Sequence, residues 1–129
     1  MKRLVLLTVF VAIASSAQAP SAAPIGDWEG ESVCQVPKPC TTEHVIYEIK
    51  QSDAEKITIK ADKVVEGKRE WMGDIDCRWS VKEQKLNCPM DGRRPAEWVF
   101  WLKGDRLLGE LTLREGNVVY RKVDATRKK

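Results

Sequence analysis

The sequence lacks the motifs on which most enzyme classes depend. It has no glycine-rich phosphate loop and no Gly-x-Ser-x-Gly turn, which argues against nucleotide-dependent and serine-hydrolase chemistry. His44 is its single histidine, and nothing beside it supplies the matched acid, base or nucleophile that proton transfer or covalent catalysis requires. We therefore predict no catalytic residues and interpret His44 as an exposed side chain.

Metal-binding patterns are also missing. The four cysteines include no Cys-x2-Cys pair of the kind that holds structural zinc. Asp74 and Asp76 share one face of a strand, but no calcium-loop continuation, with its glycine and distal glutamate, follows them. We expect no metal and no cofactor.

Only one long apolar run occurs, at the amino terminus. Lys2 and Arg3 precede the run 4–14, and small residues follow it up to Ala19, as in a secretory signal peptide. The run has about eleven residues, well short of the roughly twenty needed to cross a bilayer, so we predict no membrane insertion. We predict a signal peptide over 1–19, with cleavage between 17 and 23, a spacer over 20–25, and a protein that is secreted, or periplasmic in a Gram-negative bacterium.

Neither sign of charge dominates. The chain has 22 Lys and Arg against 19 Asp and Glu, a formal net charge of +3. Loss of Lys2 and Arg3 with the signal peptide would leave 20 against 19, a net charge of +1. Nucleic-acid-binding domains usually carry a strongly basic surface, so we expect no nucleic-acid partner.

After the spacer, most segments alternate polar and apolar residues with period two, which predicts half-buried strands. No segment has a sustained helical period, and turn residues such as Glu66-Gly67 and Asp91-Gly92 separate the alternating segments. We predict an all-β domain over 26–123, an antiparallel meander of about eight strands closed into a lipocalin-like barrel, because closure removes exposed sheet edges. Residues 124–129 are expected to form a basic tail.

Four cysteines in an oxidising compartment predict two disulfides. If a hairpin turns at Lys82-Glu83, Cys77 lies opposite Cys88 and these two residues pair. Cys34 and Cys40 are then left to close the short connection between them. The other two connectivities are not excluded by the sequence.

Three residues, in the first and last strands, resemble the lipocalin and wider calycin pattern. Gly26-Asp27-Trp28 opens the first strand and Arg121 lies in the last one. In calycins, a Gly-x-Trp near the start packs under an Arg or Lys of the final strand and closes one end of the barrel. The resemblance implies this closing role for Trp28 and Arg121, although the helix that follows the barrel in lipocalins has no counterpart in the six residues after 123.

The chain also resembles a group of small bacterial secreted proteins. This resemblance favours a periplasmic setting and implies no activity. The shared residues are Gly26-x-Trp28-x-Gly30-Glu31-Ser32-x-Cys34, Pro39-Cys40, Val45-x-Tyr47, Ala61-Asp62-Lys63 and Leu108-x-Gly-x-Leu111-x-Leu113 before Arg121.

Aromatic residues provide the main functional signal. The side chains that can face the barrel interior are Tyr47, Trp79, Trp98 and Phe100. They are explained either as core, since aromatics dominate burial in small domains, or as the walls of a cavity for an apolar ligand. A barrel of about eight strands is compatible with both.

Val99 and Trp101 alternate with the inward residues, so they must face outward. The sequence offers no helix to cover them, and an exposed tryptophan beside valine is typical of an interface. We predict a contact there with another protein or, in a homodimer, with a second copy of the chain.

The sequence as a whole favours a non-catalytic binding protein. It would hold a small apolar ligand in the barrel or a protein partner on the outer face. The alternative is a proteinaceous hydrolase inhibitor that acts through the disulfide-closed Cys34–Cys40 loop, which presents Lys38, or through the N-terminal segment, because preorganisation lowers the entropic cost of binding.

Overall fold

The structure, a computed structural model, describes residues 9, 11 and 23–128. The predicted signal peptide and its cleavage region therefore lie almost entirely outside the described residues. Among the described residues, no helix has the length and apolar character needed to span a membrane.

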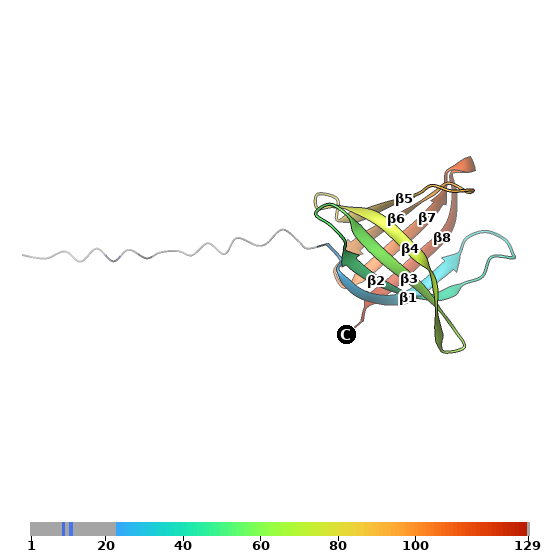
Figure 1. Ribbon diagram of the computed structural model, residues 1–129, viewed down its shortest axis with the longest axis horizontal. Coiled ribbons are helices and arrows are strands. Elements are labelled where there is room, and N and C mark those ends of the chain that lie inside the picture. Colours follow the sequence, from blue (N-terminus) through green and yellow to red (C-terminus); the bar gives the residue numbers. More distant parts are fainter. Residues whose placement is uncertain (1–8, 10, 12–22, 129) are drawn as a thin grey trace, which may run out of the picture.

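The chain folds into eight antiparallel strands that form one closed barrel, with β8 paired back onto β1 (Figure 1). This confirms the predicted all-β meander and its closure. The strands are β1 (Gly26–Cys34), β2 (Glu43–Gln51), β3 (Ile57–Val65), β4 (Lys68–Ser80), β5 (Lys85–Met90), β6 (Ala96–Lys103), β7 (Arg106–Leu113) and β8 (Val118–Arg127), with a short 3-10 turn at Glu115–Asn117 before β8.

The barrel interior is filled by the apolar set of the period-two pattern. In β6, for example, Ala96, Trp98 and Phe100 are buried while the residues between them are only partly covered. Equivalent inward residues from the other strands complete one continuous core. Burial of one face per strand is what a closed antiparallel barrel of this size requires.

Glycine permits two close approaches in the wall. A β-carbon on Gly30 would lie 1.9 Å from the carbonyl oxygen of Asp124, so β1 and β8 meet backbone to backbone there. A β-carbon on Gly109 would lie 2.6 Å from the ring of Phe100. The Phe100 ring therefore packs closely against β7 at Gly109.

Both predicted disulfides are present, Cys77–Cys88 between β4 and β5 and Cys34–Cys40 across the β1–β2 connection. The predicted hairpin register is also confirmed, because Trp79 lies opposite Leu86. Two disulfides indicate an oxidising environment of the extracellular kind.

The first half of β4 has no counterpart in the alternating pattern of the sequence. β4 begins at Lys68, and its first half pairs with the end of β3 in a hairpin that projects from the barrel (Figure 1). Side chains 68–72 are exposed on both faces, so this half has no alternation of apolar residues from which a strand could be predicted.

The carboxyl-terminal segment differs from the expected tail. β8 continues to Arg127, and Ala125 is buried within it. Lys122 and Asp124 lie on the outer face of this strand, whereas Arg121 and Arg127 share the inward face of Ala125. The strand pairs with both β1 and β7. Residues 124–127 therefore belong to the barrel wall and complete its closure.

Candidate functional site

A cavity of about 280 Å³ opens at one end of the barrel. The connections that follow β1, β3, β5 and β7 gather at this end because successive strands alternate in direction. Exposed Met72 and Met90 stand at its entrance. Its apolar walls are formed by Val45, Tyr47, Ala61, Ile75, Trp98 and Leu111.

Three of the four predicted ligand-binding aromatics form one cluster at this cavity. Trp98 stacks on Phe100 with ring centroids 5.1 Å apart, and Tyr47 meets Phe100 edge to face at 5.6 Å. Tyr47 and Trp98 line the cavity, whereas Phe100 is fully buried behind them. Phe100 therefore holds the two lining rings in place.

Trp79 lies elsewhere. It is partly buried against the core, nearer the β4–β5 turn, and does not line the cavity. Its indole nitrogen is buried and has no hydrogen-bond partner among the described residues.

Polar groups line one side of the same cavity. The Arg121 guanidinium donates to the backbone oxygen and hydroxyl of Ser32, both at 3.2 Å, and to Glu43 Oε1 at 3.4 Å. Ser32 is 2% exposed. Asp74 also lines the cavity and accepts a hydrogen bond from the indole of Trp71.

Arg121 thus lies at the open end of the barrel, and its predicted contact with Trp28 is wrong. Arg127 occupies that place, with its guanidinium carbon 4.4 Å from the centre of the Trp28 ring. The reason is the length of β8, whose register sets Arg127 opposite Trp28 and Arg121 opposite Cys34. A basic side chain of the last strand does cover the Trp28 ring, but it belongs to Arg127 and not to Arg121.

Burial and the charge of Glu43 change the pKa of Tyr47 in the cavity wall. Burial, and then the nearby Glu43 carboxylate, raise the pKa of the Tyr47 phenol well above its ordinary value. Tyr47 therefore stays neutral in the physiological range.

Sequence reasoning missed Ser32, Glu43 and Asp74 as cavity residues. A signal was available for Glu43, which precedes Val45 and Tyr47 at intervals of two and so shares their inward face. The same period places Arg121 on the face of Val123 and Ala125.

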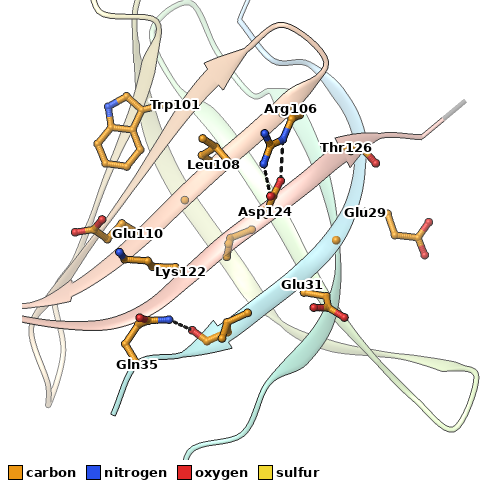
Figure 2. A pocket seen from close by; sticks show the side chains of 14 residues that line it. Glu29, Glu31, Gln35, Trp101, Arg106, Leu108, Glu110, Lys122, Asp124 and Thr126 are labelled. Carbon is orange, nitrogen blue, oxygen red and sulfur yellow. Dashed lines mark hydrogen bonds and ion pairs between the residues drawn. The ribbon is translucent and has the colours of Figure 1, made fainter.

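The predicted interface residues lie on the outside of the barrel. Trp101 is half-buried and lies beside Leu108 of β7 at an open groove of about 900 Å³ over β7, β8 and β1. Figure 2 shows this groove, crossed by the ion pair of Arg106 with Asp124. Val99 is half-buried on the same outward side of β6 but does not line the groove.

The Cys34–Cys40 loop projects beside the open end of the barrel, and Lys38 is exposed on it (Figure 1). Inhibition of a hydrolase through this loop stays a prediction.

No protein-family model and no curated protein matches this chain. Among solved structures, the barrel is similar to two mutants of the fluorescent protein UnaG. One has a TM-score of 0.56 and 14% identity, over 83% of this chain and 97% of the UnaG chain. The other has a TM-score of 0.52 and 15% identity, over 80% and 94%. The likeness shows the fold and fits the calycin-like resemblance, and the bacterial secreted group stays a prediction.

Proposed function

We propose that the protein is a non-catalytic binding protein that holds a small, largely apolar ligand in the cavity at the open end of the barrel. The observation that supports this proposal is the cavity itself, with Tyr47 and Trp98 in its wall and Phe100 behind them. Concave, mostly apolar sites with a few convergent polar groups are the usual form of small-molecule sites. The setting would be secreted or periplasmic, in keeping with the two disulfides.

The test is a calorimetric titration with a neutral probe, 4-phenyl-1-butanol. Ala61 is 5% exposed and lines the cavity, so Ala61→Phe should fill the space and weaken binding by about tenfold or more. Val99→Phe adds bulk on the outer wall and is the matched control. Binding that is unchanged by Ala61→Phe in a folded variant would contradict the proposal.

A second function, binding of a protein partner or a second copy at Val99 and Trp101, is favoured by one observation. Trp101 and Leu108 lie opposite each other across β6 and β7 and border the outer groove. A half-buried tryptophan beside a leucine on an outer strand face is the kind of anchor that interfaces use.

A further inference from the structure

The charged side chains at the cavity indicate which ligands it can accept. Those that line it are Glu43, Asp74 and Arg121. Two carboxylates against one guanidinium give a net formal charge of −1. An anionic ligand would therefore meet net repulsion where water is partly excluded and charges are weakly screened.

The one positive group is already engaged. Arg121 is 13% exposed at its side chain and Glu43 is 24% exposed. The guanidinium donates to Glu43 and twice to Ser32. A ligand carboxylate would have to displace Glu43 from this pair and leave it uncompensated, which is costly in a partly buried site.

The aromatic wall favours the opposite charge. Tyr47 and Trp98 line the cavity, and the faces of phenol and indole rings attract cations through their quadrupoles. The Tyr47 hydroxyl adds an oxygen that can accept a hydrogen bond to the same residue set. Aromatic faces and two carboxylates together form a setting for an ammonium group on an apolar body.

We propose that the cavity selects small organic cations, an ammonium group attached to an apolar body, over carboxylates of the same shape. The proposal rests on the proposed function, that the cavity binds a small ligand. The volume of about 280 Å³ lies just below the roughly 300–1,000 Å³ of drug-sized sites. The ligand is therefore small.

The experiment compares three probes that differ only in the end group: 4-phenylbutylamine, 4-phenyl-1-butanol and 4-phenylbutanoate, at pH 7 and low salt. We expect the amine to bind about tenfold more tightly than the carboxylate, with the alcohol between them. A carboxylate that binds as tightly as the amine would overturn the selectivity. Binding of none of the three would overturn the proposed function as well, so the two failures are distinguishable.

Substitution of Glu43 tests the selectivity more directly than the comparison of probes alone. Glu43→Gln keeps the size of the side chain and frees the Arg121 charge, so the variant should prefer the carboxylate over the amine. Glu110→Gln removes a carboxylate from the outer groove and should leave the order of the probes unchanged. An unchanged order in folded Glu43→Gln would contradict the proposal.

Asp74 allows the same test without disturbing the partly buried ion pair of Glu43 and Arg121. Asp74→Asn removes an exposed carboxylate at the cavity rim and should weaken amine binding about threefold while leaving alcohol binding unchanged. This variant decides the matter if Glu43→Gln does not fold. Equal losses for both probes would contradict a charge-based selection.

Discussion

Arg127 and Trp28 form the contact that closes the barrel at the end opposite the cavity. The indole is fully buried and donates to the Pro24 carbonyl at 3.0 Å, while the guanidinium covers its ring and donates to the Ile25 carbonyl at 2.7 Å. Arg127 is exposed, so Arg127→Ala should lower the free energy of unfolding by about 0.5–1 kcal/mol. Urea denaturation measures the loss, and Arg127→Lys should recover part of it. An Arg127→Ala midpoint equal to wild type would show that the contact is not stabilising.

Gly109 gives a second prediction about a single residue. The β-carbon of Gly109→Ala would overlap the Phe100 ring, and overpacking of this kind costs about 1–3 kcal/mol. Gly92→Ala is the control, because nothing lies within 4 Å of the added carbon there. Similar melting temperatures for the two variants would mean that the ring moves aside freely.

Glu29 and His44 form a hydrogen-bonded pair on the outer face of the barrel, and this pair lowers the pKa of Glu29. A hydrogen bond from the His44 ring, and secondarily the charge of Lys128, hold the pKa of the Glu29 carboxyl below its ordinary value. A lowered folded-state pKa stabilises the protein above the unfolded-state pKa, and this stability is lost as the pH falls through the folded value. His44→Ala should raise the Glu29 pKa toward normal, more than Lys128→Ala does, in carbon-13 NMR titrations. An unmoved Glu29 would assign the shift to other groups.

Among the strands, β4 and β5 are joined by a disulfide that lies in the core. Cys77 and Cys88 are 2% and 0% exposed and stand eleven residues apart in sequence. Replacing both by alanine should lower stability by about 3 kcal/mol through loop entropy. The double substitution of Cys34 and Cys40, whose separation is six residues, should cost less, about 2 kcal/mol on the same model. Denaturation midpoints in the opposite order would show that packing of the sulfur atoms or native strain decides the cost.

The strands that could be predicted from the sequence are those with one buried and one solvated face. β2 and β6 fall in this class because Val45, Tyr47 and Ile49, or Trp98 and Phe100, repeat at intervals of two. The projecting half of β4 could not be predicted because it packs against no core. The end of β8 keeps the period of two, with Val123 and Ala125 buried, but Arg127, Lys128 and Lys129 at the end of the sequence favoured a basic tail instead.

Part of the candidate site could be predicted because its aromatic residues lie on strands with one buried and one solvated face. Tyr47 and Trp98 were identified by the inward face of their strands. Arg121 was assigned to the wrong end of the barrel, since the position of a residue along the barrel axis depends on strand register, which local pattern does not reveal. Glu43 lines the cavity and Asp74 lies at its exposed rim, on strands whose neighbours are known only once the barrel is closed.

For the molecule as a whole, we predict that the outer face of β6 at Trp101 forms any contact with a second copy or a partner protein. Trp101→Lys should leave the fold intact, with a change in stability within about 0.5 kcal/mol, because the side chain lies outside the core. It should abolish any dimer or partner complex that uses this face, as measured by sedimentation velocity. Unfolding of the variant would instead make Trp101 part of the stabilising core.

The pairing of β8 with β1 also determines where a fusion partner or a tether can be joined to the barrel. The backbone nitrogen of Lys128 donates to the Asp27 carbonyl at 2.8 Å, so the chain enters and leaves the barrel side by side, at the end away from the cavity. A fusion partner or a surface tether at either end would leave the entrance unobstructed. The same proximity suits circular permutation, in which a short linker joins residue 128 to residue 24 and new ends are opened in the turn between β4 and β5.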